Sequence, residues 1–151
     1  MGTFLNNAWY VAAWTDEVSR TPLSRTLLDQ PIVFYRTVDG TPVAMHDRCP
    51  HRFVPLSGGE VRGDDIMCPY HGLTFNAEGL CTHERANALL RERFCLRTYP
   101  LTERYGALWI WMGDAARADP DLIPHFHLFD APSHVIAGRG MTHIAANYTL
   151  E

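Results

Sequence analysis

The sequence lacks the features that mark a membrane, secreted or nucleic-acid-binding protein. No stretch of its 151 residues reaches the about 18 consecutive apolar residues of a membrane span. The N-terminus, MGTFLNNAWY, has no basic region followed by an apolar one, as a secretory leader has. A formal net charge of -4 leaves no basic stripe that could neutralise phosphates. We therefore expect a cytoplasmic protein that binds neither nucleic acid nor membrane.

The chain is also short and holds few cysteines. It has no internal repeat and no low-complexity segment. With 46% apolar residues it can bury one core but not two large ones, so we expect one compact domain. In a reducing compartment, four cysteines are more typical of thiols or metal ligands than of a disulfide framework.

Short apolar runs separated by turn residues indicate a mostly β fold. Residues 31–47 hold a β-branched and aromatic run, the turn dipeptide Asp39-Gly40 and a second apolar run, which predicts a hairpin. Residues 106–112, GALWIWM, are apolar throughout and predict a buried strand. Only the segment after Asp114 looks helical, and we expect one short helix there before strand-like character returns near the end of the chain.

Two short Cys/His motifs lie in the middle of the chain. The stretch CPHRFVPLSGGEVRGDDIMCPYH, residues 49–71, opens with Cys49 and His51 and closes with Cys68 and His71. Turn residues around both motifs predict two tight loops carried on short strands. Each loop therefore offers one thiol and one imidazole.

Two kinds of metal centre use two Cys and two His. A structural zinc site of this composition usually takes a Cys pair from one segment and a His pair from another. Here each loop supplies one of each, which suits a dinuclear centre in which one iron takes both thiolates and the other both imidazoles. That is the Rieske 2Fe-2S arrangement, with a reduction potential of about -150 to +300 mV. The spacing favours this cluster, and zinc stays the alternative.

The neighbours of the four candidate ligands fit the same chemistry. Pro50 and Pro69 each follow a cysteine and stiffen its loop. Gly72 has no Cβ to keep backbone amides from the cluster sulfides. Tyr70 can offer a hydroxyl to a cysteine sulfur, and Arg52 places a positive charge beside a cluster that becomes more negative on reduction. We therefore count Arg52, Tyr70 and Gly72 among the cofactor-binding candidates.

The two loops resemble those of a known family. CPHR at 49–52 and CPYHG at 68–72 are similar to the cluster-binding loops of Rieske non-haem iron oxygenase α-subunits, which hydroxylate aromatic rings or remove O-methyl groups. Leu73 stands where many ring dioxygenases carry Trp, which is compatible with the demethylase type. Further segments resemble the vanillate and dicamba O-demethylase subgroup: NAWYVAAW at 7–14, LSRTLLDQPIVFYR at 23–36, FNAEGLC at 75–81 and DPDLIP at 119–124.

The resemblance implies a layout for the chain. Residues 1–115 would form a Rieske domain, an antiparallel β-sandwich with a small two-loop cluster-binding subdomain at about residues 46–83. Residues 116–151 would be a linker and the first piece of an incomplete catalytic domain. ANYTLE at 146–151 is similar to the start of a family segment whose acid links the Rieske site of one subunit to the iron of its neighbour. In this chain that acid would fall beyond Glu151.

The resemblance also implies an electron relay. Cys49 and Cys68 would bind the buried iron of the cluster, and His51 and His71 the outer one. In the family, a reductase or ferredoxin feeds electrons singly to the cluster, which passes them to a mononuclear Fe(II) held by two His and one carboxylate. This chain would hold the electron input and no catalytic residue of its own. The full-length protein would bind an aromatic substrate and neighbouring subunits of a homotrimer.

Two other functions stay open, a free-standing Rieske-type ferredoxin and a zinc-stabilised binding module. A ferredoxin needs neither the start at 7–14 nor the end at 146–151, which disfavours it. We expect surface or packing roles, because no carboxylate lies at ligand spacing, for the four histidines in the last part of the chain: His125, His127, His134 and His143. Cys81 and Cys95 are expected to be small buried hydrophobic residues.

Overall fold

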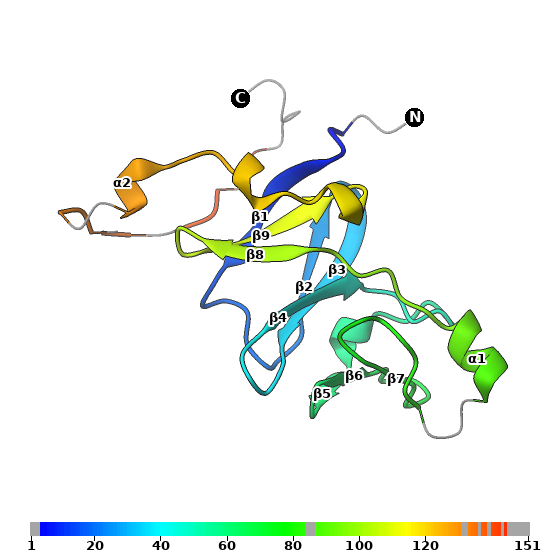
Figure 1. Ribbon diagram of the computed structural model, residues 1–151. Helices are drawn as coiled ribbons and strands as arrows, with labels where there is room; N and C mark the ends of the chain where they lie inside the picture. The colour runs from blue at the N-terminus through cyan, green and yellow to red at the C-terminus, as the bar shows by residue number, and fades with distance from the viewer. Residues whose placement is uncertain are drawn as a thin grey trace.

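The described residues form three small antiparallel sheets, stacked in layers (Figure 1). The computed structural model describes residues 4–83, 87–130, 133–135, 137–138, 140–142 and 144. The mostly β, antiparallel fold expected from the short apolar runs is confirmed.

The first sheet forms one outer layer. Its strands are β1 (Ala8–Trp14), β8 (Leu101–Arg104) and β9 (Ala107–Met112), in the order β1-β9-β8. All six residues of β9 are buried, as its unbroken apolar run predicts. Trp9 pairs with Trp111 across β1 and β9, and their rings meet edge to face at 5.4 Å between centroids. The central strand of this sheet is therefore fully packed.

The second sheet is the middle layer, and its central strand is packed on both faces. Its strands are β2 (Leu23–Leu27), β3 (Gln30–Arg36) and β4 (Pro42–His46), in the order β2-β3-β4. The hairpin predicted around Asp39-Gly40 joins β3 to β4. Because side chains alternate along a strand, Ile32 packs in the core shared with the first sheet and Val33 in the core on the opposite face. This explains why β3 reads as a continuous apolar run rather than an alternating one.

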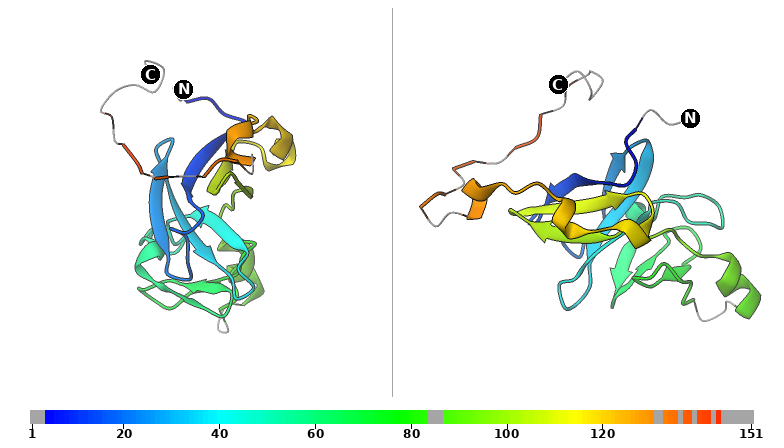
Figure 2. Two further views of the ribbon diagram at one scale, coloured as in Figure 1. Left: turned by 90° about the vertical axis from the view of Figure 1, so that its left-hand side faces the viewer. Right: turned by 45° about the horizontal axis from the view of Figure 1, so that its top comes forward.

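The third sheet belongs to a segment that we call the insert, residues 47–97. Its strands are β5 (Glu60–Arg62), β6 (Asp65–Met67) and β7 (Thr74–Phe75), preceded by the 3-10 turn η1 (Leu56–Gly58). The two ends of the insert lie side by side, because His46 N–H donates to the Arg97 carbonyl at 2.9 Å. In both views of Figure 2 the insert hangs from one end of the middle sheet.

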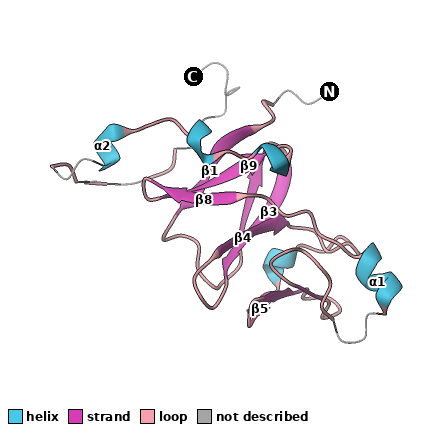
Figure 3. Cartoon of the chain, viewed as in Figure 1, coloured by secondary structure: helices cyan, strands magenta, loops and turns pink. Residues whose placement is uncertain are grey.

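Besides η1, the described residues form only short helices (Figure 3). They are α1 (Ala88–Arg93), η2 (Ala115–Arg117), η3 (Pro120–Leu122) and α2 (His127–Asp130). The helical character expected after Asp114 is present, although divided among three pieces. The sequence reading missed α1, and the strand expected near the end is absent from the described residues between 133 and 144. Among the described residues, no helix is long and apolar enough to cross a membrane.

Tyr35 makes the stability of the fold sensitive to alkaline pH. Its ring is fully buried on β3, and its hydroxyl donates to the Asp64 carbonyl at 3.0 Å. Burial raises the pKa of Tyr35, and the carboxylates of Asp65 and Asp64 raise it further. Since the folded-state pKa exceeds the unfolded one, the contribution of Tyr35 is complete below about pH 10 and is lost as pH rises towards the folded-state pKa.

We expect the free energy of unfolding to fall above about pH 10 by about 1.4 kcal/mol per pH unit from this residue. Tyr35→Phe should lose about 1 kcal/mol at neutral pH with the hydrogen bond, yet show a shallower alkaline decline. Urea unfolding of both proteins at neutral and alkaline pH measures the two slopes. Equal slopes would contradict the assignment.

Candidate metal centre

The first Cys/His loop is a tight turn closed by two main-chain hydrogen bonds. Cys49 N–H donates to the Val54 carbonyl at 2.9 Å, and Phe53 N–H donates to the Cys49 carbonyl at 2.8 Å. Phe53 lies in the left-handed region with a φ of +58°. This conformation costs a non-glycine residue free energy, so the surrounding contacts must hold it in place.

The second loop has the same backbone design. Cys68 N–H donates to the Leu73 carbonyl at 2.8 Å, and Gly72 N–H donates to the Cys68 carbonyl at 3.1 Å. Gly72 takes the left-handed position with a φ of +71°, which a glycine adopts without strain. The need for Gly72 in this structure is therefore conformational, and each cysteine lies at the base of an equivalent turn.

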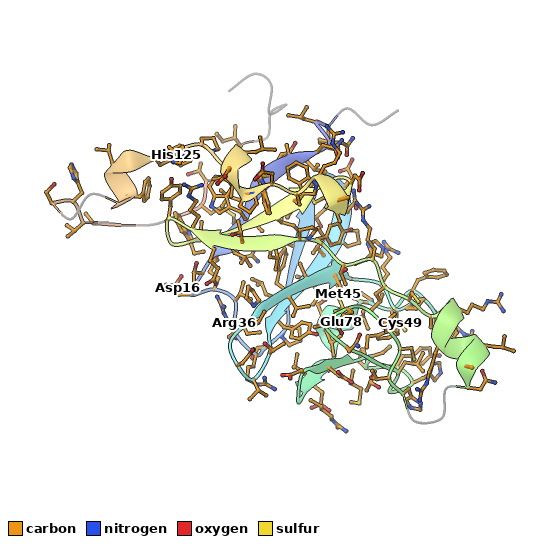
Figure 4. The ribbon with its side chains drawn as sticks, viewed as in Figure 1. Asp16, Arg36, Met45, Cys49, Glu78 and His125 are labelled. Atoms are coloured by element: carbon orange, nitrogen blue, oxygen red, sulfur yellow. The ribbon has the colours of Figure 1, made fainter. Side chains whose placement is uncertain are left out.

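The two thiols are adjacent and buried. Cys49, labelled in Figure 4, is 1% exposed and Cys68 is 2% exposed, and both pack in the core between the middle sheet and the insert. Burial raises the pKa of the Cys49 thiol to about 11. The backbone N–H of His51 opposes this rise, the Cys68 thiol within hydrogen-bonding reach adds to it, and the N–H of Arg52 opposes it.

The two imidazoles lie together at the surface. The rings of His51 and His71 are 4.8 Å apart between centroids, and both residues are exposed. An aromatic ring supports each of them: Phe94 lies 5.9 Å from His51, and Tyr70 lies 3.9 Å from His71. The loops therefore place a thiol pair inside and an imidazole pair outside.

The donor set fits a dinuclear iron–sulfur cluster. Among the described residues, no three His, Cys, Asp or Glu side chains group as ligands of one metal ion. The four candidates form two pairs instead, and a Rieske cluster takes two thiolates on one iron and two imidazoles on the other. The buried Cys49 thiol resists ionisation alone, and a bound metal compensates for that cost because its positive charge stabilises a thiolate.

The other predicted site residues lie around the imidazole pair. Arg52 is exposed. Tyr70 is 59% exposed and stacks on His71, while no hydrogen bond from its hydroxyl to a cysteine occurs among the described residues. The sequence reading missed Phe94, and only its position directly after α1 could have signalled a side chain held against the loops.

The cysteines outside the loops differ from each other. Cys81 is 3% exposed in the core of the insert, as expected. The expectation that Cys95 is buried is wrong, since it is exposed. Cys95 pairs with Leu80 through an isolated bridge, and its sulfur lies 3.6 Å from the Arg91 carbonyl at the surface.

Of the four histidines after residue 120, those whose side chains the structure describes are exposed. His125 is exposed, with its Nδ1 3.1 Å from the Arg104 guanidinium (Figure 4), and His134 lies beside the Ser133 hydroxyl. The side chain of His127 and the whole of His143 are outside the described residues.

Known proteins are similar to this chain over nearly its whole length. The Rieske [2Fe-2S] domain model matches residues 8–100. The oxygenase component of dicamba O-demethylase from Stenotrophomonas maltophilia is 45% identical over 149 residues, which cover 98% of this chain and 44% of that protein. The vanillate O-demethylase oxygenase subunit from Pseudomonas sp. (strain HR199 / DSM 7063) is 42% identical over 151 residues, covering 97% and 41%.

A solved structure gives the same result in three dimensions. The crystal structure of dicamba monooxygenase bound to dicamba superposes with a TM-score of 0.79 at 46% identity, covering 86% of this chain and 39% of that one. This chain therefore spans less than half the length of the proteins it matches.

Proposed function

The chain belongs to the Rieske [2Fe-2S] domain family, and from this premise we propose that it is the electron-transfer domain of a longer oxygenase that acts on aromatic compounds. The main support is the arrangement of the candidate metal ligands, with two thiols in the core and two imidazoles at the surface. A bound [2Fe-2S] cluster supplies the domain with a one-electron acceptor and donor.

We propose that Cys49 and Cys68 bind the inner iron and that His51 and His71 bind the outer one. Burial of the thiols supports this, because it keeps water from the inner side of the centre. Exposure of the imidazoles supports it too, because electrons must enter and leave through the outer side. Arg52, at the rim, would balance part of the negative charge gained on reduction.

The aromatic neighbours hold the imidazoles in place. Phe94 against His51 and Tyr70 against His71 restrict rotation of the rings. Gly72 shapes the second loop through its left-handed backbone. In this proposal these residues orient and shield the ligands and transfer no group themselves.

The electron donor is proposed to be a separate reductase or ferredoxin. The names of the relatives, an oxygenase component and an oxygenase subunit, support a system of several proteins. The family resemblance supports the finer proposals: a mononuclear Fe(II) outside this chain, a homotrimer and an aromatic substrate. It also supports a Rieske domain over residues 1–115 followed by a linker and the start of a catalytic domain. A cytoplasmic location is proposed because none of the four cysteines forms a disulfide.

A coupled assay tests the proposal. The 151-residue chain is supplied with NADH, a compatible reductase, ferrous iron and a methoxylated aromatic acid. We expect bleaching of the visible absorption as the cluster is reduced, with no demethylated or hydroxylated product, because dioxygen activation needs two electrons and a second iron site. A colourless, zinc-containing chain would overturn the proposal in favour of a binding module. Product formation would reveal an iron site within this chain.

A further inference from the structure

A buried carboxylate lies two residues before the first cysteine. Asp47 is 3% exposed and is the one buried charged side chain among the described residues. Its Oδ2 accepts hydrogen bonds from the hydroxyls of Ser24 at 2.8 Å and Ser57 at 2.6 Å, and its Oδ1 accepts from the Ser57 N–H at 2.7 Å. These three donors offset the free-energy cost of burying the charge, which an unpaired carboxylate would pay in full.

Asp47 joins the middle sheet to the loops. It directly follows β4, and its own N–H donates to the Pro31 carbonyl on β3 at 2.9 Å. Ser24 belongs to β2, whereas Ser57 belongs to η1, directly after the first loop. The carboxylate thus ties both ends of the first loop to one point of the sheet, and η1 buries Leu56 in the core that holds both thiols.

The negative charge of Asp47 lies close to the first loop, which its hydrogen bonds also hold. Two trans peptide units separate its Cα from that of Cys49 by at most about 7.6 Å. The carboxylate is shielded from water, so its field is weakened less than that of a surface charge. A nearby negative charge disfavours the addition of an electron to a metal centre that gains negative charge on reduction.

We propose that Asp47 is a positioning residue that clamps the first loop to the middle sheet and, through its buried charge, lowers the reduction potential of the cluster. This inference rests on the proposed ligation of the cluster by the two loops and adds a determinant of its potential that lies outside the ligand set.

The test measures the midpoint potential of purified, cluster-containing protein by mediated redox titration. Asp47→Asn keeps the shape, and its amide can donate to the two serine hydroxyls, but the charge is gone. We expect the equilibrium constant for reduction to rise about tenfold, which is about 59 mV for one electron. Asp47→Glu keeps the charge in a longer side chain, so it should lose thermal stability while its potential stays near that of the wild type.

Two controls separate charge from structure. Asp39→Asn removes an exposed carboxylate before the opposite end of β4 and should leave the potential unchanged. The double variant Ser24→Ala/Ser57→Ala removes two donors but keeps the charge, so its potential should be no higher than that of the wild type. If Asp47→Asn fails to retain the cluster, a rise in the potential of this double variant above that of the wild type would still overturn the charge effect.

The outcomes distinguish this inference from the function beneath it. A wild-type chain without a Rieske spectrum would overturn both. A normal spectrum with an unchanged potential in Asp47→Asn would overturn the charge effect alone. A rise in the double serine variant equal to that in Asp47→Asn would also overturn it, because loosening of the loop would then account for the shift.

Discussion

Replacement of His51 or His71 by alanine is expected to abolish the visible absorption of the cluster and to remove nearly all bound iron. Each imidazole is proposed to supply one of two protein ligands to the outer iron, and alanine has no donor to replace it. The loss should be complete rather than graded, because an exposed iron with a missing ligand is open to water on the surface where both rings lie. Absorption spectra and iron and sulfide analysis measure it.

Cysteine variants are the matched controls for this experiment. Cys81→Ser and Cys95→Ser should retain the cluster, since neither residue lies in the two loops. Cys49→Ser and Cys68→Ser should lose its normal spectrum. Retention of a Rieske spectrum by a histidine variant, or its loss from Cys95→Ser, would show that the ligands are misassigned.

Gly59→Ala is expected to destabilise the protein more than any conservative surface change. A Cβ on Gly59 would lie 1.9 Å from the Met67 carbonyl oxygen and 3.1 Å from that of Leu56, both of them main-chain atoms. No side-chain rotation relieves such a clash, so η1 and β6 must move apart beside the second loop. We expect a loss of about 3 kcal/mol, or roughly 10 °C in Tm, in thermal unfolding of the cluster-containing protein.

The neighbouring glycine provides the control. A Cβ on Gly58 would meet only the Pro69 side chain, at an ordinary contact distance of 3.7 Å. Gly58→Ala should therefore change stability by no more than about 0.5 kcal/mol in either direction. Similar melting temperatures for the two variants would refute the role assigned to the close approach at Gly59.

The sequence predicts those parts of the structure that depend on neighbouring residues. The dipeptide Asp39-Gly40 specifies the β3–β4 hairpin, since a glycine with a φ of +89° suits that turn. The Cys/His spacing identifies both loops because each is closed within six residues. In both cases residues close together in the sequence were enough to predict the structure.

Features that depend on distant contacts were not predictable in the same way. Pairing of β1 with β9 joins residues such as Ala8 and Met112, and no apolar period indicates that partnership. The clamp at Asp47 needs Ser24, which is remote in the sequence. The helix α1 was missed because six residues are too few to show a helical period, although its alanine, leucines and arginines are all strong helix formers.

Because its two ends lie side by side, the insert can be exchanged for a segment of different length. Its ends meet where His46 donates to Arg97, so residues between them can change in number without altering the register of the sandwich strands. The same β-sandwich could carry cluster-binding segments of other sizes. Any replacement must still cover Val33, Tyr35 and Met45, which the sandwich presents to the insert and would otherwise expose to water.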